Sequence, residues 1–389
     1  MTEINYHNEP NRSDKTLIVR KEQPYNAEPT PADLVKHFVT PEKYFFCRSH
    51  GPIPELNEAT HRIHVEGLGI KDAPVSFSVQ DLKDNFDKKN VMMAMQGNRR
   101  EDLHMVKHTE GVIWGPGAVG NAIYTGCLLK DVLKAAGIDP SMGHNPRLHV
   151  AFESVELTED DEKPYGASVP LSKALDEYGD VLLAYEMNGN PLARDHGYPV
   201  RVVIPGYIGA RSVKFLQTIR IQDKESNAYH QQLDYKILPE HVENEKEAEK
   251  YWSKVPAIGE YNVQSFVCTP PDGMMDDNNG HQAVSCQAEG YALSGGGRSI
   301  QRVDVSGDEG KTWVEAQLHT QPFEERDGAY TWSWTLWKAT VKAHKGIRIM
   351  SRAVDSAGNI QQENPVWNYR GVLSNAWRTM VTPAEKDKR

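Results

Sequence analysis

A change of pattern on either side of one charged stretch constrains the fold of this chain more than any other feature. The stretch, PEHVENEKEAEKYWSK, occupies residues 239–254 and is either a solvated helix or a linker. Before it, strand-like and helix-like segments alternate, whereas after it only short strand-like segments occur. Because 389 residues suffice for about two domains, we expect a domain boundary at this stretch.

The first region is predicted to mix strands and helices over residues 36–250, behind an extended, weakly structured arm at 1–35. The segments RIHVEGLG and APVSFSVQDL alternate apolar and polar residues, which is typical of half-buried strands, and RVVIPGYIGARSVKFLQTIRI is also rich in strand formers. By contrast, TGCLLKDVLKAAGI predicts a helix with one apolar face, and Gly137 is placed to end it.

The second region, residues 255–389, is predicted to be all β. Short strand-like runs such as AVSCQAEGYAL, SIQRVDVSGDEGKTWVEAQL and GIRIMSRAVDSAGNI are separated by turn signals. In YTWSWTLW, the side chains of Trp332, Trp334 and Leu336 share one face of a strand. Several short strands at regular spacing favour a β-sandwich of the immunoglobulin type.

Charge and cysteine usage exclude several classes of protein. A net charge of -10 argues against nucleic-acid binding and against a basic membrane-surface role, so an anionic substrate would need a locally cationic pocket. No apolar stretch reaches membrane-spanning length. The four cysteines lack CxxC spacing, which disfavours a zinc site or a disulfide scaffold. We expect a soluble, intracellular protein, and the sequence leaves its compartment open.

Cationic and aromatic residues occur together in five segments, each of which is a weak signal by itself. The segments are YFFCRSHGPIPEL, RDHGYPVRVVIPG, GARSVKF, QLDYK and NPVWNYRGVLSNAW. The chain contains no GxSxG nucleophile elbow, no P-loop and no HExxH. The glycine-rich SGGGRS, at 294–299, lies between expected strands and therefore predicts a turn rather than a phosphate cradle.

Taken in order, these segments resemble one family, the sulfite oxidases, over nearly the whole chain. The blocks that carry the resemblance are QPYNAEP, RSHGPIP, GNRR, YGASVPLSKALD, VLLAYEMNGNPL, RDHGYPVRVVIPGYIGARSVKFL, ALSGGGRSIQRVDVSGDEGKTW and VWNYRGVLSNAW. The arm and RSHGPIP look most like the haem-free plant-type branch. The haem motif HPGG and a flavin reductase domain are absent, so we expect neither haem nor flavin, and nitrate reductase is disfavoured.

The resemblance implies an α+β cofactor-binding domain of the sulfite oxidase fold, followed by an immunoglobulin-like β-sandwich that mediates homodimerisation. The implied cofactor is molybdenum bound to molybdopterin. Its binding residues would be Phe46, Cys47, Arg48, Ser49, His50, Glu156, His196, Arg201, Ser212, Val213 and Lys214. Glu156 stands where the family usually has an aspartate, so we expect a retained but shifted pterin contact.

The resemblance also implies the oxidation of sulfite to sulfate, with Arg48, Asp234, Tyr235 and Arg370 at the substrate. Arginine suits this role because its guanidinium stays charged and presents a planar fork of donors to an oxyanion. Tyrosine can add a directional hydrogen bond, while the cofactor carries the redox chemistry. Without a haem, dioxygen is the expected electron acceptor, with peroxide as product.

One position departs from the family pattern. In the family, the cysteine that binds molybdenum stands where this chain has Met95, in MQGNRR. A neutral thioether is a weaker ligand than a thiolate, and the change removes a negative charge from the metal. Met95 is therefore an isolated substitution in an intact enzyme, the mark of a relative with altered redox chemistry, or the mark of a non-catalytic molybdopterin-binding protein. Cys47, beside Arg48, is the alternative source of a thiolate.

Overall fold

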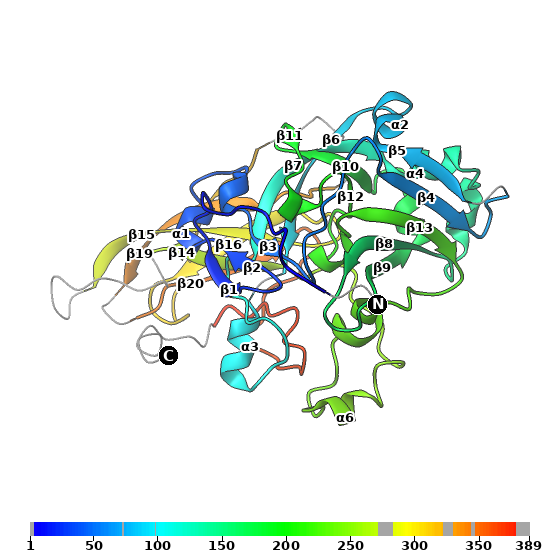
Figure 1. Cartoon of the computed structure of the whole chain (residues 1–389). Coiled ribbons are helices and arrows are strands. Elements are labelled where there is room, and N and C mark those ends of the chain that lie inside the picture. Colours follow the sequence, from blue (N-terminus) through cyan, green and yellow to red (C-terminus); the bar gives the residue numbers. More distant parts are fainter. Residues whose placement is uncertain are drawn as a thin grey trace.

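The computed structural model describes residues 4–71, 74–97, 99–270, 283–321, 330–343 and 347–378. Within these ranges the chain forms two parts, and Figure 1 shows most of the C-terminal strands on the left and most of the N-terminal strands at the centre and right. Asn98 of the GNRR block and the C-terminal end of the 255–389 region lie outside the described residues.

The N-terminal part contains three sheets. The strands of the first sheet, in order, are β1 (Ile18–Lys21), β2 (Asn26–Glu28) and β3 (Cys47–Arg48). The second sheet consists of β11 (Asn190–Pro191), β10 (Leu182–Met187), β7 (Val119–Leu128) and β6 (Lys89–Gln96), with β12 (Arg201–Val203) also paired to β10. The third consists of β5 (Val75–Ser78), β4 (Arg62–Gly67), β13 (Leu216–Gln222), β8 (His149–Leu157) and β9 (Pro164–Pro170).

Helices are short throughout the described chain. The α-helices are α1 (Pro31–Leu34), α2 (Val79–Asp84), α3 (Arg100–Val106), α4 (Leu129–Ala135), α5 (Leu171–Leu175) and α6 (Glu245–Ala248). The 3₁₀ turns are Glu42–Tyr44, Pro140–His144, Arg194–His196 and Gly209–Arg211, and His230–Asp234 forms a π-helical turn. Single π-helical turns are rare and often mark functional sites. No helix of the described residues is long and apolar enough to cross a membrane.

The main core of the N-terminal part lies between the second and third sheets. Fully buried residues such as Val65 from β4, Phe152 from β8 and Leu183 from β10 belong to one apolar cluster. Leu129 and Leu133 of α4 join this cluster, because residues four apart lie on the same face of a helix. The two sheets are thereby held as a rigid frame, from whose strand ends and loops the polar side chains of the site project.

The C-terminal part is a β-sandwich, as predicted. One sheet has the order β14 (Gln264–Thr269), β15 (Val284–Leu293), β19 (Thr335–Ala343) and β18 (Gln317–His319), and the other has the order β17 (Val314–Glu315), β16 (Ile300–Ser306) and β20 (Met350–Asp355). Alternate residues of both sheets are buried in one core, with Trp337 from one sheet and Val303 from the other. The predicted α+β domain followed by an immunoglobulin-like sandwich is confirmed.

Three local predictions differ from the structure in detail. APVSFSVQDL is a strand only as far as Ser78, because Ser78 and Asp81 form a capping box that starts α2. TGCLLKDVLKAAGI begins as part of β7, since Cys127 pairs with Leu183, and its helix starts at Leu129. In the charged stretch 239–254, only α6 is α-helical.

The arm is extended but more structured than expected, since β1, β2 and α1 all lie within it. In this small sheet, Asn26 of β2 pairs with Arg48 of β3, and Ala27 pairs with Cys47. The arm thus holds the segment that carries two of the predicted site residues.

Tryptophan side chains fix the two parts of the molecule against each other. The indole Nε1 of Trp332 donates to Asp180 at 2.8 Å, and that of Trp334 donates to the carbonyl of Phe38 at 2.9 Å. The backbone N–H of Ala94 in β6 donates to the carbonyl of Trp332 at 2.9 Å. These buried contacts connect β6, which carries Met95, with the sandwich domain. Separately, the backbone N–H of Glu110 donates to the carbonyl of Tyr369 at 3.0 Å, which holds the C-terminal segment against the first domain.

Candidate active site

A deep pocket in the N-terminal part opens beside the sandwich domain and encloses about 1090 Å³, its open mouth included. The predicted site residues that line it are Phe46, Arg48, His50, Met95, Glu156, His196, Arg201, Ser212, Lys214 and Tyr235. Residues 371–373 of the C-terminal segment form part of its wall. Side chains from widely separated blocks of sequence therefore meet in one cavity.

Cys47 and Arg48 lie on opposite faces of β3. Arg48 lines the pocket, and its Nη1 donates to Asn26 Oδ1 at 3.0 Å and to the Ser49 carbonyl at 2.7 Å. The Cys47 side chain instead packs in a cluster with Tyr25 and Ala27, and Lys15 Nζ lies 3.5 Å from its Sγ. Burial, reinforced by the charge of Asp195, raises the Cys47 pKa to about 11, so the thiol stays protonated. Alternation along the strand turns Cys47 away from the pocket.

Two further residues of the predicted set lie near the pocket without lining it. Ser49 is fully buried, its N–H donates to Asn26 Oδ1 at 3.3 Å, and its Oγ has no hydrogen-bond partner among the described residues. Val213 belongs to the main apolar core, and its backbone carbonyl accepts from Val202 N at 3.0 Å. Asp234 and Arg370, the remaining two, form an ion pair beside Tyr235.

A lysine cluster, defined here as His196, Arg201, Ser212 and Lys214, lines one part of the pocket. Arg201 donates from Nη1 to the His196 carbonyl at 3.0 Å and from Nη2 to the Ser212 carbonyl at 2.8 Å. Lys214 Nζ donates to the Asp195 carbonyl at 3.0 Å. Burial lowers the pKa values of Arg201 and Lys214, because removal from water disfavours the charged forms. Both cations donate to backbone carbonyls, and within the described residues neither forms an ion pair with a carboxylate, although Glu156 and Asp195 act on Lys214 electrostatically.

The arm supports the lysine cluster from behind. Arg12 Nη2 lies 2.7 Å from Asp195 Oδ1, and Lys15 Nζ lies 3.0 Å from Asp195 Oδ2. Burial works against ionisation of Asp195, but these cations hold its pKa well below the usual range. The neighbouring His196 has its pKa lowered well below the ordinary value by burial and by Lys15, so its imidazole is neutral.

Glu156 positions the loop that follows β3. Its Oε1 accepts from the backbone N–H of His50 at 2.9 Å and of Gly51 at 3.0 Å. Gly51 is required there, since a Cβ atom would lie 1.8 Å from the carbonyl oxygen of Leu157. Glu156 is buried and lines the pocket, which places a carboxylate beside the lysine cluster.

Met95 lies at the C-terminal end of β6, where this strand reaches the pocket. It is buried and lines the pocket, and its Sδ lies 3.6 Å from Nη2 of Arg201. The turn at Gly209 approaches so closely that a Cβ there would lie 3.2 Å from Met95 Cγ. The thioether therefore occupies a tightly enclosed position that faces the cavity.

An arginine cluster, defined here as Arg48, Arg100 and Arg370, surrounds Asp234 and Tyr235. Arg370 donates to Asp234 Oδ1 from Nε at 3.0 Å and from Nη2 at 2.5 Å, and Arg100 Nε donates to the Arg370 carbonyl at 2.9 Å. Burial opposes ionisation of Asp234, but Arg370 and the neighbouring cations more than offset it and lower its pKa to about 2. Burial lowers the pKa of Arg100 to about 10, against the opposing effect of Asp234. One carboxylate thus faces three guanidinium groups.

Sequence reasoning missed several residues of the pocket. Arg100 stands in the GNRR block, but nothing in that pattern indicates that its side chain lines the pocket. Tyr165 of the YGASVPL block lines the pocket, and burial raises its pKa well above the ordinary value. Arg12 and Lys15, which support the pocket through Asp195, could not be predicted, because the sequence of a polar arm does not indicate which surface the arm covers.

The donor set fits a phosphate-bearing pterin. Three buried polar atoms of the predicted set have no hydrogen-bond partner within the described chain: Ser49 Oγ, His196 Nε2 and Arg201 Nε. Buried donors are nearly always paired in native proteins, so such atoms indicate a missing polar partner. The pocket is large, cationic and lined with aromatic side chains such as Phe46 and Trp114.

The fold and this site define a class, the molybdopterin-dependent oxidoreductases that carry a dimerisation domain. Residues 50–230 match the family described as the oxidoreductase molybdopterin binding domain, and residues 255–383 match the Mo-co oxidoreductase dimerisation domain. Among curated proteins, the sulfite oxidase of Arabidopsis thaliana is 40% identical, and the match covers 97% of this chain and 96% of that protein. The chain belongs to the sulfite oxidase family, as its sequence blocks predicted.

Other relatives are longer than this chain. The mitochondrial sulfite oxidase of Rattus norvegicus is 41% identical, over 96% of this chain and 66% of that protein. The nitrate reductase of Hordeum vulgare is 38% identical, over 91% of this chain and 40% of its own length. The chain thus spans just under two thirds of the rat protein. Among solved structures, the sulfane dehydrogenase SoxCD of Paracoccus pantotrophus shares the fold, with a TM-score of 0.69 and 24% identity over 93% of this chain and 88% of that one.

Proposed function

We propose that the pocket binds the molybdenum–molybdopterin cofactor and that the protein oxidises sulfite to sulfate, with dioxygen as the electron acceptor. Sulfite and water yield sulfate, two protons and two electrons, and the electrons reduce dioxygen to peroxide. The observation that carries the proposal is the meeting of Arg48, Arg100 and Arg370 around Tyr235 at the edge of a large cationic pocket. The near full-length match to a plant sulfite oxidase supports it.

The lysine cluster would hold the pterin and its phosphate. Lys214 and Arg201 supply positive charge, while His196 Nε2 and Arg201 Nε offer donors without a partner in the described chain. Charge-assisted hydrogen bonds to phosphate are roughly twice as strong as neutral ones. When bound, the cofactor supplies the two-electron redox chemistry. We propose no haem and no flavin for the described chain, because neither has a sequence motif here.

The arginine cluster would bind the oxyanion. Arg48 lines the pocket with its side chain held by Asn26, and Tyr235 raises the Arg48 pKa although burial works against it. Arg370 is pinned by Asp234 and would contribute charge from the C-terminal domain. Because Asp234 has a pKa of about 2, it stays ionised and positions Arg370, rather than exchanging protons near neutral pH. Tyr235, hydrogen-bonded to Arg48, is the group placed to orient the substrate.

The test combines composition with turnover. Purified full-length protein should contain molybdenum and pterin in equal amounts, measured by elemental analysis and by the fluorescence of the oxidised pterin. It should reduce ferricyanide when sulfite is added and consume dioxygen when ferricyanide is omitted. Background levels of pterin after expression in a cofactor-producing host would refute cofactor binding. A loaded protein that ignores sulfite would refute the substrate assignment alone.

A second function, cofactor binding with impaired catalysis, is favoured by Met95. Its thioether contacts Arg201, and the resemblance implies that Met95 stands at the position of the family's molybdenum-binding cysteine, while Cys47 is turned away and protonated. Near-stoichiometric molybdenum together with negligible sulfite oxidation would establish this second function.

We also propose that the protein is a symmetric homodimer formed through the sandwich domain, which matches a dimerisation domain. Closed two-fold pairs are the commonest oligomers, and this match concerns that very domain. Light scattering on the purified protein should give twice the mass of the 43.8 kDa chain. A monomeric mass across micromolar concentrations would contradict it.

A further inference from the structure

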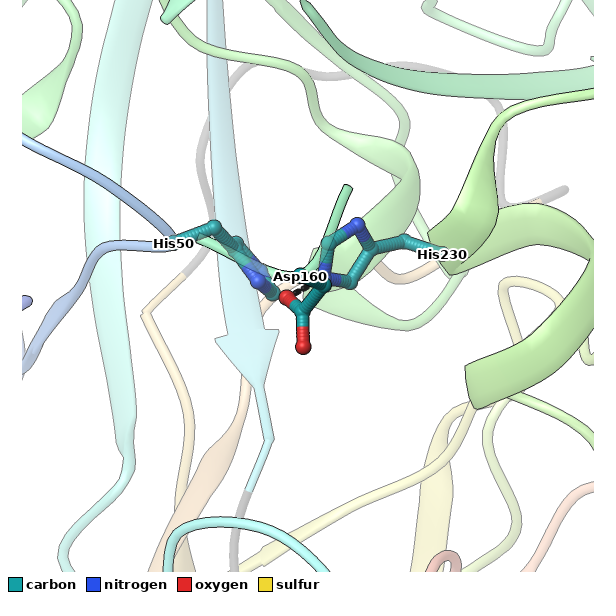
Figure 2. Close-up of side chains that lie close together, drawn as sticks. All are labelled: His50, Asp160 and His230. Atoms are coloured by element: carbon teal, nitrogen blue, oxygen red, sulfur yellow. Dashed lines mark ion pairs between the residues drawn. The ribbon is translucent and has the colours of Figure 1, made fainter. Parts of the chain in front are cut away.

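Two histidines and one carboxylate from three separate segments meet beside the pocket. His50 follows β3, Asp160 follows β8, and His230 begins the π-helical turn. Figure 2 shows the three side chains converging, and their ligand atoms all lie within 4.8 Å of one another. His50 also lines the pocket, so the group lies at the pocket's edge.

The imidazole of His50 is buried without a hydrogen bond. The residue is only 7% exposed, and among the described residues no hydrogen bond to either of its ring nitrogens occurs. Its ring stacks on Tyr165 at a centroid distance of 4.5 Å and meets the His230 ring edge-on at 4.0 Å. Burial and the charge of Arg48 hold its pKa well below the ordinary value, so the ring is neutral and keeps a free lone pair.

The other two members are already paired and differ in exposure. His230 Nε2 lies 3.0 Å from Asp160 Oδ2, and this contact lowers the Asp160 pKa. The His230 side chain is buried, whereas that of Asp160 is 41% exposed. The group therefore has two buried nitrogen donors and one oxygen donor that solvent reaches.

We propose that His50, Asp160 and His230 form a binding site for one divalent transition-metal ion, with Zn²⁺ as its representative. Two neutral imidazoles and a carboxylate are a common zinc donor set, which leaves a position open for water. With metal–ligand distances of about 2.0–2.2 Å, tetrahedral ligand atoms lie roughly 3.3 Å apart, so the separations between the ligand atoms must shrink by at most about 1.5 Å. The exposed Asp160 side chain has room to move towards the rings, and the His50 and His230 rings, whose centroids are 4.0 Å apart, must also separate for both nitrogens to face one ion.

Charges around the group set the strength of this site. Arg48, Arg100 and Lys214 all act on His50 and disfavour a dication, while Asp160 and Asp234 favour it. We therefore expect a dissociation constant of about a micromolar, weaker than that of a closed structural zinc site. The proposal goes beyond the oxidation of sulfite and does not depend on it, because metal binding is measured directly.

The test is a titration of the full-length protein with ZnCl₂ by calorimetry and with CoCl₂ by visible absorption. Wild type should bind one ion per chain, and Co²⁺ should show the intense ligand-field bands of a low-coordinate site. Asp160→Asn removes the ligand charge at an exposed position, and His230→Phe keeps an aromatic ring in the stack. Each should weaken binding by at least about tenfold, as even outer partners of metal ligands change affinity by about 10–100-fold.

The chain offers a matched control in a second histidine pair. The rings of His104 and His108, on and just after α3, lie 5.4 Å apart, and His108 is 3.9 Å from Glu110. His108→Gln should leave the wild-type titration unchanged. Equal binding by wild type, Asp160→Asn and His230→Phe, or loss of binding in His108→Gln alone, would overturn the proposal. So would wild-type protein that binds no Zn²⁺ at millimolar concentration.

Discussion

The lysine cluster and the arginine cluster meet at the same pocket, which Arg48 and Arg100 line and Arg370 does not, and the two clusters are built in different ways. His196, Arg201, Ser212 and Lys214 fall within twenty residues of one another, and their cations hold backbone carbonyls. The members of the arginine cluster come from β3, α3 and the C-terminal segment, and they share one carboxylate, Asp234. A local segment thus makes the first cluster, whereas tertiary packing makes the second.

This difference in construction predicts different roles for the lysine cluster and the arginine cluster. Arg201 and Lys214 form no ion pair with a carboxylate within the described chain, so their charge is available for a bound phosphate. Guanidinium groups around one carboxylate are held in fixed positions, and the net positive charge that remains suits a small oxyanion. Damage to the first cluster should therefore affect cofactor content, and damage to the second should affect substrate binding.

Met95, which contacts the lysine cluster, gives the largest expected effect. Met95→Cys should restore a thiolate at the metal and raise the turnover of sulfite by at least about tenfold, as even outer partners of metal ligands change activity by about 10–100-fold. The half-saturation for sulfite should change little, because Arg48 and Arg370 are untouched. Steady-state ferricyanide assays, normalised to molybdenum content, measure both quantities.

Met95→Leu, which keeps an apolar side chain of similar size, is the control and should stay at the parental rate. X-ray absorption at the molybdenum edge should gain one sulfur neighbour in Met95→Cys. If the cysteine variant matches the parent in rate and spectrum, Met95 does not occupy the ligand position. Cys47→Ser should change neither the rate nor the absorption spectrum, because the thiol lies on the face of β3 that is turned away from the pocket.

Lys214→Met tests the lysine cluster. It keeps the length of the side chain but removes a buried charge, so cofactor affinity should fall by about ten- to a hundredfold, equivalent to a charge-assisted hydrogen bond of about 1.5–3 kcal/mol. Pterin content per chain measures this fall. The fraction that still carries cofactor should keep its half-saturation for sulfite, and a normal pterin content would show that Lys214 does not hold the cofactor.

Arg370→Gln tests the arginine cluster. It should raise the half-saturation for sulfite by roughly ten- to a hundredfold, for the same loss of about 1.5–3 kcal/mol, while pterin content stays normal. Arg378→Gln is the matched control, because Arg378 pairs with Glu363 on the surface of the same segment. An unchanged sulfite dependence in Arg370→Gln would mean that the oxyanion binds elsewhere.

Asp234→Asn should have the smallest and most pH-dependent effect. The folded-state pKa of about 2 lies below the ordinary value of 3.8, so this carboxylate contributes stability that is present above about pH 4 and lost as the pH falls towards 2. This lowering of the Asp234 pKa corresponds to about 2 kcal/mol of unfolding free energy. Urea unfolding should show that the difference in unfolding free energy between wild type and Asp234→Asn shrinks as the pH falls from about 4 towards 2. A constant difference would mean that the ion pair with Arg370 does not set this pKa.

The sequence predicted the lysine cluster better than the arginine cluster, for a physical reason. Arg201 and Lys214 lie in one block whose strand-and-turn pattern keeps near neighbours close together in space. Arg100 is the second arginine of the GNRR block. Its Nε donates to the backbone carbonyl of Arg370, and no local sequence pattern predicts a contact between residues so far apart in the chain. The arm's Lys15 was missed for the same reason.

By itself, the sequence determined the order of the two domains, the strand-rich character of the second, and the block that carries Met95. These follow from hydrophobic periodicity and turn chemistry, which act over a few residues. Only the tertiary structure decided which face of β3 each side chain occupies, how Arg370 meets Asp234, and that His50, Asp160 and His230 meet at one point. Such contacts depend on how the packed sheets and the tryptophan contacts orient distant segments, and that orientation is a property of the whole core rather than of any segment.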